Sequence, residues 1–287
     1  MKSTWPFQVF HKYNDELNEM LWANRAAIKQ TYSNFKTNNA KWTDLASDHL
    51  IFDVPKGEEV FKNLKEWSES YNKFNNWTNL NALLALSSNF ETYIATVVSL
   101  AIESDQGVLY GVTKSIDGVQ LLKKGSTKNI FHEDVIESFT KGDWNSRKSA
   151  FSKTFGTVPT GLESEIGELE KIRNLRNKIG HAFGRDIEES RNHEVKSILN
   201  MDKLTDSQLK KKQYVIMRTV ALIDHYLLEN HIGEFQAIAF YHRIYPGLRQ
   251  DIHQSDRAII LKKQLGKFGD ISGKEFCKGL VKYYEDI

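Results

Sequence analysis

The sequence is poor in cysteine and in net charge. Its 287 residues include a single cysteine, Cys277, which excludes an internal disulfide framework and a cysteine-rich zinc site. Lys and Arg together number 39 and Asp and Glu number 37, so the formal charge is only +2. Because this balance gives no overall electrostatic signature of nucleic-acid binding, any site for an anion must be local.

Long apolar runs are also scarce. The longest, at about residues 93–102, is about half the length of a membrane span and lies between Glu91 and Glu103. Residues 1–6 lack the apolar core of a signal peptide. We therefore expect a cytoplasmic protein that does not associate with membranes.

Proline occurs at only four positions, and the segments between them carry apolar residues at helical spacing. The clearest pattern runs from Leu80 to Ala101, with apolar residues every three or four positions. Thr78 or Asn79 is expected to cap the start of this helix. Further helical patterns cover residues 12–35, 58–76, 131–140, 146–155, 161–183 and 206–230. No segment alternates with period two, so the sequence predicts an all-α fold.

The composition divides the chain into three parts. Five of the six tryptophans precede residue 78, and residues 1–75 are expected to form an N-terminal helical layer. Residues 76–232 are expected to form a helical bundle, with a glycine-rich system of turns at residues 107–125. Residues 233–287 read as a C-terminal extension of short helices joined by turns.

The segment at residues 168–184 concentrates groups that handle phosphate and protons. One side of its helical wheel is apolar and is expected to face the core: Ile172, Leu175, Ile179 and Ala182. The other side carries Arg173, Arg176, Asn177, Gly180 and Gly184, with His181 at its edge. Glycine inside a helix costs about 1 kcal/mol relative to alanine. Two glycines here indicate that something approaches the backbone closely or, for Gly184, that the helix ends there.

These groups suffice for RNA cleavage without a metal ion. His181 can exchange protons near neutral pH, and Arg176 can stabilise the charge that develops on the phosphorus centre. Asn177 lies one helical turn before His181 and can position the substrate or the ring. One helix supplies one histidine, whereas acid–base cleavage benefits from two proton-transfer groups. We therefore expect a two-fold homodimer with this face at its interface.

The stretch Arg176-Asn177-Lys178-Ile179-Gly180-His181 resembles the Arg-x4-His signature of the HEPN superfamily of helical ribonucleases and nucleotide-binding proteins. The order of helices over residues 76–232 is similar to that family as well. The resemblance implies a helical bundle, a homodimer with a composite active site and metal-independent endoribonuclease activity on RNA. It also implies a toxin or anti-phage role, with an antitoxin or another defence protein as partner. Some toxin members carry a modified tyrosine where this chain has Phe183, so that form of control is not expected.

Several residues keep two interpretations. Glu91 either holds Arg176 or His181 in place or forms an ordinary ion pair with Arg173 or a surface lysine. Arg173 either binds phosphate or pairs with Glu170 or Glu91. For the whole site, the alternatives are a module that binds RNA or a nucleotide without cutting it and a partner-recognition protein.

The other candidate groups are expected to be structural. Arg218 and His225 fall on one helical face without an adjacent amide, and the basic run at residues 210–212 is typical of a solvated surface. The tryptophans are expected to pack the N-terminal helices or an interface rather than to stack on bases. The histidines lack metal-ligand spacing, so we expect no metal and no cofactor.

Overall fold

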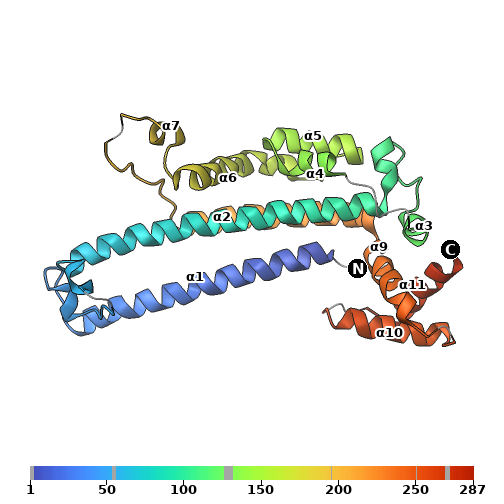
Figure 1. Cartoon of the computed structure of the whole chain (residues 1–287), viewed down its shortest axis with the longest axis horizontal. Helices are drawn as coiled ribbons and strands as arrows, with labels where there is room; N and C mark the ends of the chain where they lie inside the picture. The colour runs from blue at the N-terminus through green and yellow to red at the C-terminus, as the bar shows by residue number, and fades with distance from the viewer. Residues whose placement is uncertain (1–2, 54–55, 126–131, 195, 250, 269–271) are drawn as a thin grey trace. The chain divides into compact units, whose positions relative to one another are not determined.

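The computed structural model describes residues 3–53, 56–125, 132–194, 196–249, 251–268 and 272–287, which contain helices and no strand (Figure 1). The four longest helices are α1 (Trp5–Thr37), α2 (Leu64–Ser104), α6 (Leu162–Ala182) and α8 (Asp206–Leu227). The shorter ones are α3 (Gly118–Lys123), α4 (Glu133–Thr140), α5 (Trp144–Phe155), α7 (Ile187–Ser190), α9 (Phe235–Ile244), α10 (Gln254–Gly266) and α11 (Lys274–Asp286). The all-α prediction is confirmed. The first residue of the pattern expected at 131–140 lies outside the described residues.

The chain packs as two compact units, each assembled from separate stretches of sequence. Unit 1 comprises residues 1–10, 90–169 and 217–287, and unit 2 comprises residues 11–89 and 170–216. Each of the four longest helices contributes residues to both units. The units therefore follow packing rather than chain order, and the three ranges expected from composition stay a prediction.

Helix α2 is one continuous helix where the sequence predicts two. Thr78 and Asn79 lie in its interior, so the expectation that one of them caps a helix start is wrong. The buried Asn79 amide instead donates to the Leu204 carbonyl at 3.0 Å and to the Asp206 carboxylate at 2.8 Å. No glycine or proline interrupts α2, so its two predicted segments join into one helix.

The apolar stripe predicted on α2 is buried. Its buried members are Leu80, Leu83, Ser87, Phe90, Ile94, Val97, Val98 and Ala101, and Leu84 is half-buried. Full burial of one such large side chain stabilises the fold by about 1.5–3 kcal/mol. An 18-residue window of α2 has a mean hydropathy of 1.2, so by length and composition the helix could also cross a membrane. The core helix of a soluble protein passes the same test, and 44% of this window is buried.

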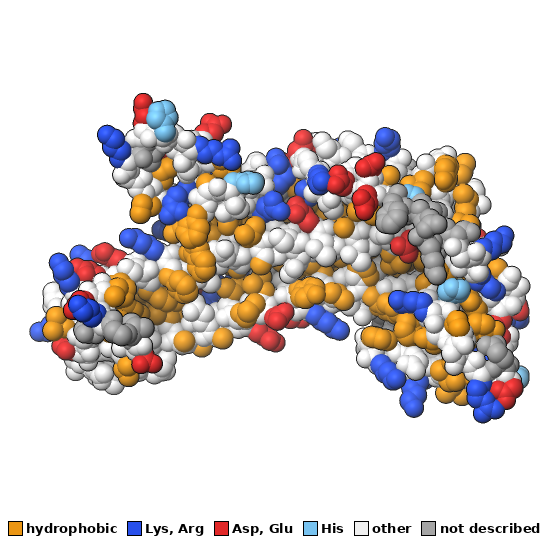
Figure 2. Space-filling model, viewed as in Figure 1, with side chains coloured by type: hydrophobic (Ala, Val, Ile, Leu, Met, Phe, Trp, Pro, Cys, Tyr) orange, Lys and Arg blue, Asp and Glu red, His pale blue; other side chains and the backbone are white. Residues whose placement is uncertain are grey.

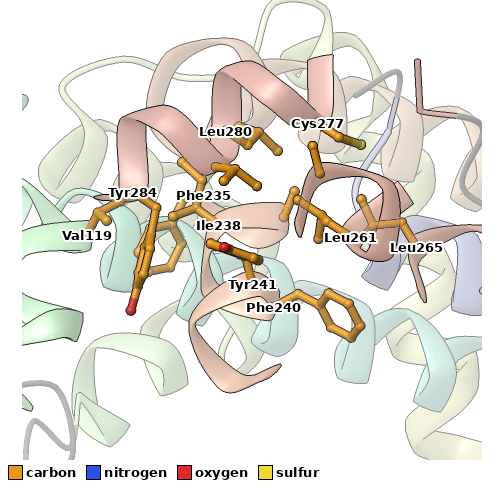
Figure 3. Close-up of a cluster of buried hydrophobic side chains, with 13 residues drawn as sticks. Val119, Phe235, Ile238, Phe240, Tyr241, Leu261, Leu265, Cys277, Leu280 and Tyr284 are labelled. Atoms are coloured by element: carbon orange, nitrogen blue, oxygen red, sulfur yellow. The ribbon is translucent and has the colours of Figure 1, made fainter. Parts of the chain in front are cut away.

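Unit 1 contains a hydrophobic cluster formed by α3, α9, α10 and α11 (Figure 3). The labelled side chains are Val119, Phe235, Ile238, Phe240, Tyr241, Leu261, Leu265, Cys277, Leu280 and Tyr284. Rings from α9 and α11 meet edge to face, with the centroids of Tyr241 and Tyr284 5.1 Å apart. The short C-terminal helices expected from the sequence thus share one core.

A buried polar group ties the start of α1 to α2 and α8 within unit 1. The Asp224 carboxylate accepts hydrogen bonds from the Thr4 amide at 3.1 Å and from the Tyr93 hydroxyl at 3.2 Å. Asp224 is 3% exposed, and Tyr93 is also buried. Burial first, and the neighbouring Asp224 carboxylate second, raise the pKa of Tyr93 well above its ordinary value.

Candidate functional site

Helix α6 ends in a left-handed turn next to the predicted site. Phe183 and Gly184 have φ angles of 55° and 75°, and the Gly184 amide donates to the Lys178 carbonyl at 3.0 Å. A Cβ atom added to Gly184 would lie 2.9 Å from Cδ1 of Leu80 on α2. The conformation therefore favours glycine, a larger residue would force the Leu80 side chain to shift, and Gly184 terminates the helix.

The chain that follows α6 is held against α2 inside unit 2. The Asn76 side chain donates to the Asp202 carbonyl at 3.0 Å and accepts from the Leu204 amide at 2.8 Å. The Asp202 carboxylate also lies 3.3 Å from Nζ of Lys178. Arg185 donates from Nε to the Leu199 carbonyl at 2.8 Å. These contacts position the C-terminal end of α6, where the predicted catalytic groups lie.

The apolar side of α6 is directed into the protein, as the helical wheel predicts. Ile172 and Ile179 are buried, whereas Leu175 and Ala182 are half-buried. Their partial exposure is consistent with positions at the edge of the apolar stripe. This side of the helix therefore anchors α6 and determines which side remains accessible.

The polar side of α6 is accessible at its C-terminal end. His181 and Gly180 are exposed, and Arg176 and Asn177 are half-buried. Nη1 of Arg176 donates to Oδ1 of Asn177 at 3.3 Å, which brings the guanidinium and the amide together. A Cβ atom added to Gly180 would meet nothing within 4 Å. Among the described residues, nothing approaches the backbone at Gly180, so this surface is open to a ligand.

Arg173 is engaged by a carboxylate on its own helix. Its Nε lies 2.9 Å and 3.1 Å from the two carboxylate oxygens of Glu170. Of the interpretations open for Arg173, the structure therefore shows the pair with Glu170. Helical pairs of this spacing contribute about 0.2–0.5 kcal/mol, so a phosphate could displace the carboxylate at small cost.

Glu91 belongs to unit 1 and pairs there with an arginine that the sequence analysis did not consider. Its Oε1 lies 3.3 Å from Nη2 of Arg147, whose side chain is 5% exposed. The neighbouring Trp144 stacks on Phe90, with ring centroids 5.6 Å apart. Glu91 thus forms an ion pair, but with the buried Arg147 instead of with Arg173 or a surface lysine, and a role for Glu91 toward Arg176 or His181 stays a prediction.

The second Arg/His combination has the surface contacts expected of it. Nε of Arg218 lies 3.2 Å from Glu165, and Nε2 of His225 lies 3.4 Å from Glu229. The Arg218 and His225 side chains are 51% and 72% exposed. They occupy a solvated helix face, and His225 provides a matched control for His181.

A row of aromatic rings leads to the candidate site, and the sequence analysis did not assign it to the site. We call Trp67, Tyr71, Phe74, Trp77 and Phe183 the aromatic ladder. The first four follow one another on α2 at spacings of four, three and three residues. That helical spacing is visible in the sequence, but the contact with Phe183 depends on the tertiary fold.

Among the residues that the structure describes, no three His, Cys, Asp or Glu side chains are grouped as metal ligands. Comparison of the chain with protein-family models, curated proteins and solved structures finds no match.

Proposed function

We propose that this protein is a metal-independent endoribonuclease that acts as a homodimer and is a member of the HEPN superfamily. The main support is the accessible polar face at the end of α6, where His181 is exposed one turn after Asn177. The contact between Arg176 and Asn177 adds a cationic, hydrogen-bonding group to the same face. An imidazole, a guanidinium and an amide together suffice for acid–base cleavage of RNA.

The proposed reaction uses the 2′-hydroxyl of the RNA as nucleophile. Its oxygen attacks the adjacent phosphorus while the His181 imidazole accepts the hydroxyl proton. The P–O2′ bond forms as the P–O5′ bond breaks, and the 5′ oxygen takes a proton from the His181 imidazolium of the second copy. The products are a 2′,3′-cyclic phosphate and a free 5′-hydroxyl.

Arg176 and Asn177 act on the charge and the orientation of the phosphate. The Arg176 guanidinium donates to the phosphoryl oxygens as negative charge develops on them. Asn177 holds the guanidinium through its side-chain oxygen and can donate its amide hydrogens to the RNA. Arg173 is a supporting cation that would exchange its carboxylate partner for phosphate.

The first experiment tests cleavage in the absence of divalent metal ions. Purified protein is incubated with total cellular RNA in EDTA, and the product ends are analysed. Wild type should cleave and leave 2′,3′-cyclic phosphate ends. His181→Ala should lose about 100- to 10,000-fold of the rate, because it removes the proton-transfer group.

His225→Ala is the matched control, because it removes another exposed helical histidine. It should cleave as fast as wild type. Cleavage retained by His181→Ala would contradict the assignment of the site. Binding of RNA without cleavage by any form would favour the non-catalytic binding module.

The homodimer is tested by sedimentation equilibrium, where the mass should be twice the 33.1 kDa of one chain. We place the protein in the cytoplasm as a toxin or anti-phage effector with an antitoxin or defence-system partner. Expression of wild type should then slow growth of a bacterial host, and expression of His181→Ala should not. Growth inhibition by both forms would show that toxicity does not depend on His181.

A further inference from the structure

The aromatic ladder forms a continuous series of ring contacts along α2 to the end of α6. Trp67 stacks on Tyr71 with centroids 5.7 Å apart, and Tyr71 contacts Phe74 at 6.1 Å. Phe74 stacks on Trp77 at 5.8 Å, and Trp77 contacts Phe183 at 6.3 Å. The ladder therefore ends two residues after His181.

The ladder is only partly covered by the protein. Phe74 is 47% exposed and Phe183 is 53% exposed, while Trp67, Tyr71 and Trp77 are half-buried. Figure 2 shows hydrophobic atoms at the surface along the N-terminal half of α2, with Lys and Arg side chains beside them. Phe74 and Phe183 are therefore the exposed rings of the ladder, whereas Trp67 and Tyr71 also pack against Tyr32 of α1. Exposed rings are typical of a binding surface rather than of a core.

The backbone at Phe183 is held in a conformation that bulky residues rarely adopt. Its φ of 55° costs about 1–2 kcal/mol for a residue with a Cβ atom. This conformation accompanies the contact of the Phe183 ring with Trp77, while half of the side chain stays exposed. This left-handed turn, which ends α6, leaves the Phe183 ring partly exposed.

One cationic group contacts an exposed ring, and two lysines are exposed in the same unit. The Arg185 guanidinium lies 5.0 Å from the centroid of the Phe183 ring. Lys73 is exposed on α2, one turn before Trp77, and Lys203 is exposed in the chain packed against α2. Flat rings flanked by basic side chains are the combination that single-stranded nucleic acids need, because bases stack on the rings while phosphates approach the cations.

We infer that the aromatic ladder is a base-stacking track for single-stranded RNA, which leads the strand to His181 and Arg176. This inference rests on the proposed function and adds the substrate class: an unpaired RNA strand with a base on Phe183 and another on Phe74. A paired strand has no base face available to these rings, so duplex RNA is excluded from the track.

The test measures RNA binding separately from cleavage. A fluorescent uridine 12-mer is titrated in EDTA with the full-length His181→Ala protein, and affinity is read from fluorescence anisotropy. Phe183→Leu and Phe74→Leu, each added to this background, keep an apolar side chain but remove the flat ring. Each should weaken binding about 5- to 150-fold, the range expected for loss of one stacked base.

Two control variants isolate the effect of stacking. Phe183→Tyr keeps the ring and should retain the affinity. Tyr110→Leu changes an exposed aromatic outside the ladder, with 71% of the residue exposed, and should leave the affinity unchanged. Circular dichroism of every variant confirms that the helical fold is retained.

The RNA itself is varied as an independent measurement. An abasic 12-mer with the same number of phosphates should bind the His181→Ala protein more weakly than the uridine 12-mer. In the double variant of Phe74 and Phe183 this difference should shrink. Equal binding of both oligomers, or unchanged affinity in the leucine variants, would overturn the track.

The result separates this inference from the proposed function. Cleavage by wild type with unchanged binding in the leucine variants would refute the track alone. Weakened binding in those variants without any cleavage by wild type would support the track and contradict the nuclease. If the leucine variants instead convert a dimer to monomers in sedimentation, the ladder is a contact between copies of this chain, and the track is refuted.

Discussion

Gly180 and Gly184 lie one turn apart at the end of α6, and alanine at the two positions should have opposite effects on stability. Gly184 has a φ of 75°, a conformation that costs an alanine about 1–2 kcal/mol. Its new methyl group would also lie 2.9 Å from the Leu80 side chain, and crowding a packed site costs about 1–3 kcal/mol. Alanine also reduces the conformational entropy of the unfolded chain, which offsets about 0.4–1 kcal/mol of these two costs. The net expectation for Gly184→Ala is a destabilisation of about 1–5 kcal/mol.

Gly180→Ala should stabilise the same protein. Gly180 lies inside α6, and a methyl group there meets no atom within 4 Å. Replacing glycine by alanine in such a helical position gains about 0.5–1 kcal/mol. Both substitutions replace glycine by alanine, four residues apart. A difference in their stability therefore reports the backbone conformation and the space at each position.

The assay is calorimetric unfolding, with the urea midpoint as a second measure. For a chain of this size, 1 kcal/mol shifts the melting temperature by about 2 °C. Gly184→Ala should therefore melt about 2–10 °C lower than wild type, and Gly180→Ala about 1–2 °C higher. The reasoning is refuted if Gly184→Ala melts at or above wild type, or if Gly180→Ala melts below it.

The same pair reports on the proposed site. Gly180 lies next to His181 on the exposed face, where the RNA backbone is expected to approach. Gly180→Ala should cleave RNA more slowly although it is more stable, because its methyl group occupies that space. Full activity in this variant would show that the substrate does not approach the backbone at Gly180.

Three further predictions concern the framework of the site. Asn79→Ala should lower the free energy of urea unfolding by about 1–3 kcal/mol, because it leaves the buried Leu204 carbonyl without its amide donor. Thr78→Ala, at the preceding position of α2, should lower it by less than about 1 kcal/mol. Burial and the Asp224 carboxylate raise the pKa of Tyr93 in the folded protein above its ordinary value of 10.0, so Tyr93 ionises first in the unfolded chain. The stability of the wild type should therefore fall as the pH rises above 10. In melting experiments, the stability of Tyr93→Phe should fall less steeply over the same pH range. Arg147→Met should lower the melting temperature, because it leaves the partly buried Glu91 carboxylate without the Arg147 guanidinium; unchanged melting would show that the pair is not needed for the fold.

Helical periodicity predicted the class of fold and the orientation of α6. Ile172 and Ile179 are buried and His181 is exposed, because a 3.6-residue period determines which side chains share a face. The same period could not tell that α2 is continuous. Asn79 has the side chain of a good helix cap, and only the distant Leu204 and Asp206 make it an interior anchor.

Side-chain contacts between segments that are distant in the sequence could not be predicted from the sequence. The spacing of Trp67, Tyr71, Phe74 and Trp77 is local, but the arrival of Phe183 at the end of this row depends on how α6 packs on α2. The pair of Glu91 with Arg147 likewise joins residues from α2 and α5. Such pairings need the three-dimensional fold, because no periodicity within one segment encodes them.

The way in which the two compact units share the four longest helices also affects the timing of folding during synthesis. A ribosome adds about 5–20 residues per second, so an emerging chain waits for every segment that completes a unit. Unit 2 carries His181, yet it also needs residues up to 216, and unit 1 needs residues up to 287. The unit that carries His181 can therefore be completed only after residue 216 has been synthesised, 35 residues after His181 itself.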